Sequence, residues 1–363
     1  MTTIQKEQLG WTSGELQALG AVDLRDLYRL SSVLQVERER VFAKSWTFVG
    51  SSSELAITGA YLTATVGNSP VVVLRDDEGV VRAFHNLCRH RSITLVAGRG
   101  QTGRFLTCPY HQWSYGLTGE LVRVPQQQEQ FPGIECGTLG LLPVAVEEWH
   151  GMIFVNLDSD AIPLTESMAG LDHRLDGFLR GPLVEVGRMD YEVACNWKFI
   201  VENHVDVYHL WYLHSRTLRE YDHRRMVWES LGNNWWSLDP LKDPDRSGQG
   251  FDLIDSTQRE GLGAHLLYPN LMIITTNNYF ATYDATPIAP DRTRLTLRIR
   301  ALEGTDSDAI IESISSFLSE DLVAGERLQQ AAESPAFALG PLALGHEQPL
   351  RSLHVSLRQD IFR

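Results

Sequence analysis

The chain has 363 residues, 43% of them hydrophobic and 21% charged, which is enough for roughly two domains with cores of their own. This composition excludes a disordered chain, a collagen-like fibre and a disulfide-stapled mini-protein. Lys and Arg number 32 against 46 Asp and Glu, a formal net charge of −14, so we expect neither a nucleic acid nor an anionic membrane as partner. No apolar run reaches the roughly 18–20 residues of a membrane span, and the N-terminus does not resemble a secretory signal. We therefore expect a cytoplasmic protein.

In the N-terminal half of the sequence, the pattern of apolar residues changes once, from helical spacing to short β-rich runs. Apolar residues at three- and four-residue spacing predict helices over residues 23–30 and 36–46. Short β-rich runs then predict an antiparallel hairpin system with a turn at 76–79. Its strands are expected over 61–66, 70–74 and 80–84, and its last strand over 151–157.

The C-terminal half mixes helices and strands. Helical segments are expected over 166–179, from about residue 197, and over 309–332; strands are expected over 184–193, 266–276, 279–286 and 293–301. The order predicts an α+β protein in which an all-β module precedes an α+β module with an antiparallel sheet. We place the first module at residues 46–157 and the second at 158–363, with residues 1–45 as a helical segment that packs on the second.

Two mixed pairs of metal-binding residues lie in the first module. They are Cys88-X-His90 and Cys108-X2-His111, with 17 residues between them. Two thiolates and two imidazoles on two short loops can close a tetrahedral zinc site, or they can hold a [2Fe–2S] cluster with two Cys on one iron and two His on the other. A zinc finger would instead show its two Cys together and its two His on a helix. The other two thiols, Cys136 and Cys195, match neither pattern and are expected in the core.

The stretch from CRHR to CPYHQWSYGLTGEL resembles the Rieske domain of the ring-hydroxylating oxygenase α subunits, which are Rieske non-heme iron oxygenases. The resemblance implies that Cys88 and Cys108 ligate one iron of the cluster and that His90 and His111 ligate the other. It also implies a helix-grip-like catalytic domain after the Rieske domain.

A second motif, ENHVDVYHLWYLH, resembles the iron motif of the same family. His209 and His214 are five residues apart, so a regular helix at about 100° per residue would splay them. For both to reach one metal, the helix must loosen or end near Leu213. The resemblance implies that both ligate a mononuclear Fe(II) and that Asn203 and Asp206 act in catalysis, with Asp206 joining an iron-ligating histidine to a Rieske histidine of the adjacent subunit. We interpret His204 as structural.

The third ligand is expected on the late helix. Ile310, Ile314, Phe317 and Leu318 belong to an apolar stripe that also includes Ile311, Leu322 and Leu328. Asp321 lies near the centre of this stripe, and a carboxylate on a buried face needs a partner or a metal. Glu320 and Glu312 are predicted to point away from it. The resemblance agrees, because the family's carboxylate ligand lies on this helix.

The resemblance implies a terminal oxygenase. Electrons would come from NAD(P)H through a separate ferredoxin and/or flavin reductase, and O2 would hydroxylate a small organic substrate by mono- or dioxygenation. No GxGxxG follows a strand, so we do not expect the chain to bind NAD itself. A homotrimeric ring is expected, with or without a separate β subunit. Two other classes stay open: a Rieske electron-transfer protein without oxygenase activity, and a zinc-stabilised binding protein.

The sequence says less about the substrate. Six aromatic residues crowd the iron motif and could line a slot for an aromatic ring or a cage for a quaternary ammonium group: Tyr208, Trp211, Tyr212, Trp228, Trp235 and Trp236. Four arginines follow and could bind a substrate carboxylate: Arg216, Arg219, Arg224 and Arg225. We expect an aromatic or carboxylated substrate, with oxidation or N-demethylation of a quaternary ammonium compound as the alternative.

Overall fold

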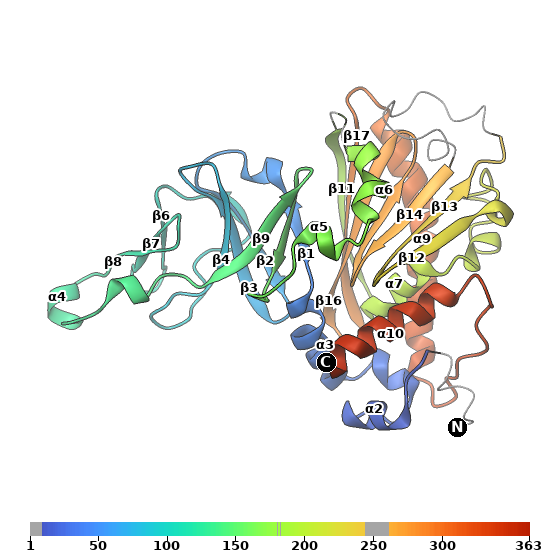
Figure 1. Cartoon of the computed structure of the whole chain (residues 1–363), viewed down its shortest axis with the longest axis horizontal. Helices are drawn as coiled ribbons and strands as arrows, with labels where there is room; N and C mark the ends of the chain where they lie inside the picture. The colour runs from blue at the N-terminus through green and yellow to red at the C-terminus, as the bar shows by residue number, and fades with distance from the viewer. Residues whose placement is uncertain (1–8, 180, 182, 244–260) are drawn as a thin grey trace. The chain divides into compact units, whose positions relative to one another are not determined.

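The computed structural model describes residues 9–179, 181, 183–243 and 261–363 (Figure 1). Contacts divide the chain into two compact units. The β unit comprises residues 38–167, and the α+β unit comprises Met1–Glu37 and Met168–Arg363. Within the described residues, no helix is both long and apolar enough to cross a membrane.

The β unit contains two antiparallel sheets. Seven strands form the larger one in the order β1-β10-β9-β4-β3-β2-β5: β1 (Thr47–Ser51), β2 (Ala60–Val66), β3 (Ser69–Arg75), β4 (Val81–His85), β5 (Arg99–Gln101), β9 (Pro143–Trp149) and β10 (Met152–Asn156). Three short strands form the smaller one: β6 (Phe105–Thr107), β7 (Ser114–Gly116) and β8 (Leu121–Arg123). Short helices complete the unit: η2 (Phe42–Lys44), η3 (Ser52–Leu55), α4 (Gln127–Gln130), η4 (Cys136–Thr138) and α5 (Leu164–Ser167).

The predicted hairpin between β3 and β4 is confirmed, and one carboxylate holds its turn. Asp76 Oδ1 accepts the backbone N–H groups of Glu78 at 2.9 Å and Val80 at 2.8 Å. Gly79 has φ +78°, a backbone conformation that side chains disfavour. Alternate residues of the strands, such as Val72 and Val73, face two separate cores. The core that contains Val72 also contains Cys88 and Cys108.

The α+β unit is built on a seven-stranded antiparallel sheet in the order β11-β17-β16-β15-β14-β13-β12. Its strands are β11 (Leu183–Val193), β12 (Val227–Leu231), β13 (Asn234–Pro240), β14 (Gly261–Leu267), β15 (Leu271–Thr275), β16 (Tyr279–Ala289) and β17 (Arg292–Leu302). Its helices are α2 (Ser13–Ala18), η1 (Leu24–Tyr28), α6 (Leu171–Leu179), α7 (Trp197–Val205), η5 (His209–Trp211), η6 (His223–Arg225), α9 (Ser307–Ala332) and α10 (Gln348–Phe362). Helix α3 (Ser31–Arg40) crosses the boundary between the two units.

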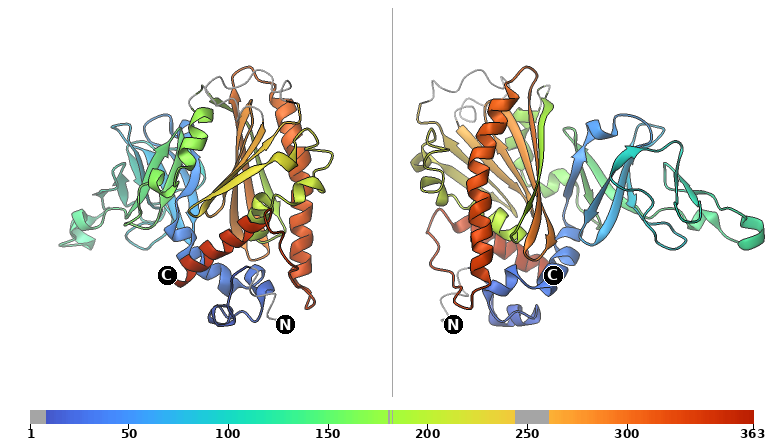
Figure 2. Two further views of the ribbon diagram at one scale, coloured as in Figure 1. Left: turned by 45° about the vertical axis from the view of Figure 1, so that its right-hand side comes forward. Right: turned by 180° about the vertical axis from the view of Figure 1, so that it is seen from behind.

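Helices α7 and α9 pack on the sheet and on each other. Helix α7 contacts β14, β16 and α9, and α9 also contacts β11. Figure 2 shows α9 as the long orange helix that runs along the sheet. The second motif begins at the end of α7 and continues through η5, beside α9 and this sheet.

Several predicted elements differ from the structure. The segment 23–30 forms a 3₁₀ turn rather than an α-helix, and the predicted helix 166–179 divides into α5 and α6. It divides because Ala169 and Gly170 have φ angles of +51° and +93°. The predicted strand 266–276 is the end of β14, a turn and then β15. Helix α10, although not predicted, carries an apolar row at four-residue spacing, Leu353, Leu357 and Ile361, which is buried.

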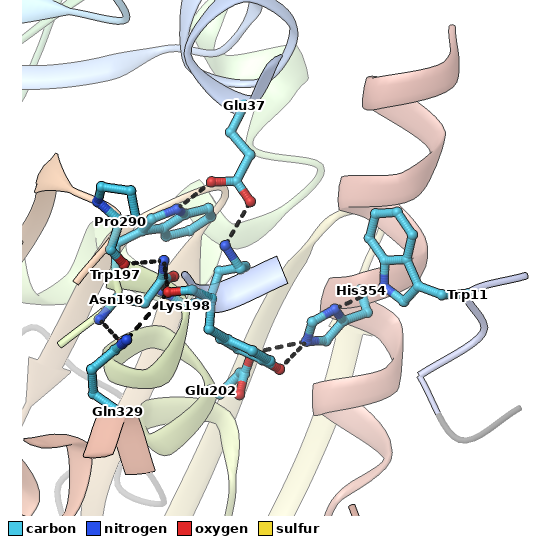
Figure 3. A network of polar contacts seen from close by, with 10 residues as sticks. Trp11, Glu37, Asn196, Trp197, Lys198, Glu202, Pro290, Gln329 and His354 are labelled. Atoms are coloured by element: carbon cyan, nitrogen blue, oxygen red, sulfur yellow. Dashed lines mark hydrogen bonds and ion pairs between the residues drawn. The ribbon is translucent and has the colours of Figure 1, made fainter. Parts of the chain in front are cut away.

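A buried polar network fixes α7 in place (Figure 3). Lys198 Nζ lies 2.6 Å from Glu37 Oε1, and Trp197 Nε1 donates to Glu37 Oε2 at 2.9 Å. Lys198 and Glu37 are only 2% exposed. One turn further on, Glu202 Oε1 accepts from His354 Nε2 at 2.8 Å on α10. The helix that carries the second motif is therefore attached to both terminal regions of the chain.

Breaking this network on one side should be costly. Lys198→Met would leave the Glu37 carboxylate buried without its countercharge, and we expect a loss of about 3–5 kcal/mol of unfolding free energy. The double variant Lys198→Met/Glu37→Gln should recover much of that loss. The matched control is Lys44→Met, because the Lys44–Asp158 pair is largely exposed and should cost at most about 1 kcal/mol. Urea denaturation measures all three, and an equal loss in Lys198→Met and Lys44→Met would contradict the expectation.

Candidate metal centres

Two loops of the β unit have the same backbone design. The carbonyl of Cys88 accepts the N–H of Ser92 at 2.8 Å, and the carbonyl of Cys108 accepts the N–H of Gln112 at 3.1 Å. Ser92 and Gln112 have positive φ angles of 56° and 60°. Each cysteine N–H is also bonded across its loop, Cys88 to Ile93 O and Cys108 to Trp113 O. Each loop thus turns tightly around one cysteine.

These loops bring the predicted pairs together. The rings of His90 and His111 lie 4.7 Å apart between centroids, and Cys88 and Cys108 are each 1% exposed in the same core cluster. Trp113 stacks on His90 at 4.8 Å. The structure therefore brings the four predicted residues together.

The chemistry of this site calls for a metal. Burial raises the pKa of the Cys88 thiol, and the nearby Cys108 adds to the rise although the Tyr115 hydroxyl, 3.3 Å from Cys88 Sγ, opposes it. Burial lowers the pKa of His90, helped by His111 and Arg91. His90 Nδ1 is buried without a hydrogen-bond partner among the described residues. The lowered pKa of His90, the buried Cys88 thiol and the two neighbouring residues Cys108 and His111 fit a mixed Cys/His metal group.

The second motif forms a compact site in the α+β unit. His209, His214 and Asp321 each offer one ligand atom, and these atoms all lie within 4.8 Å of one another. Asp321 Oδ1 is 3.6 Å from His209 Nε2 and 2.9 Å from His214 Nε2. The sequence predicts that the helix loosens or ends near Leu213; α7 ends earlier, at Val205, and His209 lies in the separate 3₁₀ turn η5. This irregular chain overcomes the splay of a regular helix.

Hydrogen bonds at the far side of each imidazole fix the ring tautomers. His209 Nδ1 contacts the carbonyl oxygen of Asp206 at 2.5 Å, and a carbonyl only accepts, so the proton is on Nδ1. His214 Nδ1 donates to Glu320 Oε2 at 2.8 Å. Both Nε2 atoms are therefore directed to the Asp321 side of the site, as metal-ligating histidines require.

The pKa of His209 favours the neutral imidazole that ligation requires, whereas the pKa of His214 is set by its two carboxylate neighbours. Burial lowers the pKa of His209 to about 4 although Asp321 opposes it. Burial also lowers the pKa of His214, but Asp321 and Glu320 outweigh it and the net pKa is raised. Asp321 Oδ1 is buried and makes no hydrogen bond within the described part of the chain. An oxygen without a hydrogen bond beside two imidazole nitrogens fits a two-histidine, one-carboxylate metal site with open positions.

The prediction for Glu320 was wrong. Its carboxylate does not point away from the site but bonds His214, and Thr217 Oγ1 donates to the same oxygen at 2.7 Å. Neighbouring residues on a helix differ by about 100°, so Glu320 and Asp321 reach opposite sides of one imidazole. The sequence feature that could have indicated this contact is that Glu320 directly precedes the predicted ligand Asp321 on the late helix. Leu328, predicted on the apolar stripe, is 42% exposed, and Gly325 and Gln329 continue the buried face.

The structure also shows where the remaining residues singled out in the sequence lie. Asn203 and Asp206 line a cavity together with the triad. Burial raises the pKa of the Asp206 carboxyl to about 7, with Glu347 and Asp321 adding to it. His204 also lines the cavity and bonds the carbonyl of His265. Of the two unassigned cysteines, Cys195 is buried as expected and Cys136 is partly exposed.

The cavity lies between the sheet and helices α7 and α9. Its walls are mostly apolar: Ile200, Val207, Leu210, Leu218, Met226, Leu262, Ala264, Met272, Ile274, Leu295, Phe317, Leu318 and Leu322. Of the six aromatic residues singled out in the sequence, only Trp235 lines it. None of the four arginines does. Arg219 and Arg224 instead line a separate hollow with Lys242.

Comparisons with known proteins match both units. Residues 45–144 match the Rieske [2Fe-2S] domain, and residues 181–361 match the catalytic domain of the ring hydroxylating alpha subunit. The two sites therefore define a protein with a Rieske centre and a mononuclear iron centre. The chain belongs to the family of Rieske oxygenase α subunits, which confirms the sequence-based resemblance and its two cofactors.

Three relatives illustrate the match. Biphenyl 2,3-dioxygenase subunit alpha of Rhodococcus jostii (strain RHA1) is 34% identical over 55% of this chain, and the matched part is 45% of that protein. Chloroplastic choline monooxygenase of Atriplex hortensis is 27% identical over 89% of this chain and 74% of its own length. A solved quaternary ammonium Rieske monooxygenase has a TM-score of 0.80 at 25% identity, with 93% of this chain and 94% of that chain covered.

Glu320 should affect iron retention through His214. Glu320→Ala leaves the Nδ1 of His214 without its acceptor, and we expect iron affinity at the triad to fall by about 10- to 100-fold. Asp321→Ala removes a ligand and should abolish iron binding there. Glu312→Ala, an exposed position of the same helix, is the control. Iron per chain after dialysis against a chelator measures all three, with the visible Rieske spectrum unchanged. Equal iron content in the Glu320→Ala and Glu312→Ala proteins would refute the role of Glu320.

Acid should destabilise the metal-free protein through its enclosed histidines. Burial lowers the pKa of His265 to about 3, whereas an unfolded chain binds this proton at about pH 6.5. The unfolded state thus binds more protons below pH 6.5, so stability falls as pH drops, by about 1.4 kcal/mol per pH unit for this group. Asp284, whose carboxyl pKa burial raises to about 6, acts in the opposite sense between about pH 4 and 6. Unfolding free energies of the wild-type and His265→Gln proteins from pH 7.5 to 5 should therefore diverge; parallel curves would exclude this contribution.

Proposed function

We propose that the chain is the terminal component of an oxygenase that uses O2 and externally supplied electrons to hydroxylate a small organic molecule. The observation that carries this proposal is that one chain brings together two Cys and two His in the β unit and two His and one Asp beside an apolar cavity in the α+β unit. A Rieske electron carrier would need only the first site. The matched part is about half the length of the biphenyl dioxygenase subunit, so the activity is inferred from the sites.

The residues divide between two cofactors. Cys88 and Cys108 would hold one iron of the Rieske cluster, and His90 and His111 the other. The mononuclear iron would be held by His209, His214 and Asp321. When bound, these groups supply one-electron transfer and O2 chemistry. Electrons would arrive from a separate ferredoxin or flavin reductase.

The protein's own contribution is to orient the ligands and to control access. The Asp206 carbonyl and the Glu320 carboxylate hold the Nδ1 protons of His209 and His214, so that each Nε2 lone pair stays available. Apolar walls such as Leu318 and Leu322 limit the water that reaches the site and leave room for an organic substrate. The substrate is thereby confined next to the triad.

Two substrate classes have support. The apolar walls favour an aromatic ring, in line with the name of the biphenyl dioxygenase subunit. A quaternary ammonium compound is the second candidate, because the rings of Trp235, Tyr283 and Phe317 and the carboxylate of Asp239 line the same cavity. The choline monooxygenase aligns over 74% of its own length, and the solved quaternary ammonium monooxygenase aligns over 94% of its own.

We further propose that the working assembly is a ring-shaped homotrimer. The solved quaternary ammonium monooxygenase is described in terms of inter-subunit electron transfer, and a heterologous ring supplies every mononuclear site with a neighbouring Rieske centre. Asp206, whose carbonyl bonds His209, would connect the two centres. Light scattering should show a trimer for the wild-type protein and for Asp206→Ala. The variant should retain both metals but lose electron transfer between them. A fully active monomer would contradict the ring.

The function is tested by metal content and product together. The purified protein should contain about three irons per chain, absorb visible light, and incorporate label from ¹⁸O2 into a substrate when a donor reductase is added. Asp321→Ala should lose the labelled product and keep the Rieske spectrum, because only one site is damaged. Stoichiometric zinc without visible absorbance, or labelled product from Asp321→Ala, would refute the proposal.

A further inference from the structure

The cavity beside the triad contains polar atoms that nothing in its walls satisfies. Three of them are buried and make no hydrogen bond to any described residue: Asp239 Oδ1, Trp235 Nε1 and the hydroxyl of Tyr283. All three residues line the cavity that His209, His214 and Asp321 also line. A buried polar group left unpaired costs about 1–3 kcal/mol, so three around one apolar space need a common explanation.

Strand β13 places two of these residues on the cavity side. Trp235 and Asp239 are four residues apart on a strand, so both side chains point to the same face of the sheet. The β14 partner of Asp239 agrees, because it is Leu262, a cavity residue. The residue next to Trp235, Trp236, points the other way and bonds Glu229. The arrangement therefore follows from the strand and not from a loop.

A neighbouring histidine holds Asp239 in place. His223 Nδ1 lies 2.5 Å from Asp239 Oδ2, and Asp239 is 2% exposed. One carboxylate oxygen is thus used by the protein and the other remains for a ligand. Burying this carboxylate is costly, and a hydrophobic residue would have filled the wall more favourably. A cavity that served only hydrocarbons would have no use for it.

We propose that Asp239, Trp235 and Tyr283 form a polar recognition subsite for the substrate. This inference deepens the proposed function and rests on it, because the cavity must be the substrate site. The substrate then has an apolar ring or chain that carries a hydrogen-bond donor, such as an amino or hydroxyl group, for Asp239 Oδ1. The N–H of Trp235 and the hydroxyl of Tyr283 meet an acceptor atom on the same molecule.

The charged side chains that line the cavity further restrict the class of substrate. Within the described residues, no Lys or Arg lines the cavity, whereas Asp206 and Asp239 do. Apart from the iron, whose charge the ligand Asp321 partly neutralises, a carboxylated substrate would meet two acidic side chains and no basic one. The subsite therefore selects a neutral or positively charged compound. This differs from the carboxylate recognition that the arginine cluster suggested.

Matched pairs of ligands test the subsite by binding alone. Isothermal titration of the iron-loaded protein under anaerobic conditions would compare aniline with toluene and 1-aminonaphthalene with 1-methylnaphthalene. Each pair has nearly the same shape and differs in one amino group. We expect at least one amine to bind about 10- to 100-fold more tightly than its hydrocarbon, and benzoate to bind no better than toluene.

Variants assign the preference to individual residues. Asp239→Asn replaces the acceptor with an amide that can present N–H, so the amine preference should disappear. Trp235→Phe keeps an aromatic ring and should weaken the amines more than the hydrocarbons. Trp236→Phe makes the same change on the opposite face and should leave the preference unchanged. Thermal unfolding checks that each variant is folded. If Asp239→Asn does not fold, the comparison of Trp235→Phe with Trp236→Phe still tests the subsite.

The outcomes separate this inference from the proposed function. Equal affinity within both pairs, no binding by either amine at millimolar concentration, or the same loss in Trp235→Phe and Trp236→Phe would overturn the subsite while oxygenation of a hydrocarbon could still be measured. Absence of iron at the triad would overturn the proposed function instead, and binding would still report on the subsite. Tight binding of benzoate would overturn the charge argument.

Discussion

The site in the α+β unit depends on how two imidazoles are held from behind. His209 and His214 can serve one metal only if both Nδ1 atoms carry protons and both Nε2 atoms face Asp321. The Asp206 carbonyl and the Glu320 carboxylate impose this on the two rings. The two acceptors affect the pKa of the rings differently. The Glu320 carboxylate helps to raise the pKa of His214, whereas burial lowers the pKa of His209 and keeps that ring neutral. The metal site is thus set by acceptors that are not themselves ligands.

The rest of the α+β unit keeps these acceptors in place. Helix α7 has to end before His209, and its position is fixed by the buried contact of Lys198 with Glu37 and by the bond of Glu202 with His354. Helix α9 then brings Glu320 and Asp321 to the same imidazole. Residues far apart in the sequence, from the N-terminal region to α10, therefore determine the geometry of a few atoms. Polar burial of this kind stabilises little on its own but specifies one arrangement.

Much of this was predictable, and the exceptions have physical causes. The spacing of Cys88, His90, Cys108 and His111 indicated a metal site, and the structure brings these residues together because local turns place each pair. Asp321 was found from helix periodicity. The same periodicity failed for Glu320, because a residue at the edge of a buried face can still reach an imidazole that inserts beside the helix. The role we propose for Asp239 could not be predicted, since it depends on a cavity that forms only when β13, α7 and α9 come together.

The account is tested most directly by locating the metals themselves. Crystals of the iron-loaded protein would be measured above and below the iron absorption edge, and an anomalous difference map would be calculated. The account predicts one signal between Cys88, Cys108, His90 and His111 and a second, single peak between His209, His214 and Asp321. No iron peak at the triad, or peaks that appear only at the zinc edge, would contradict it.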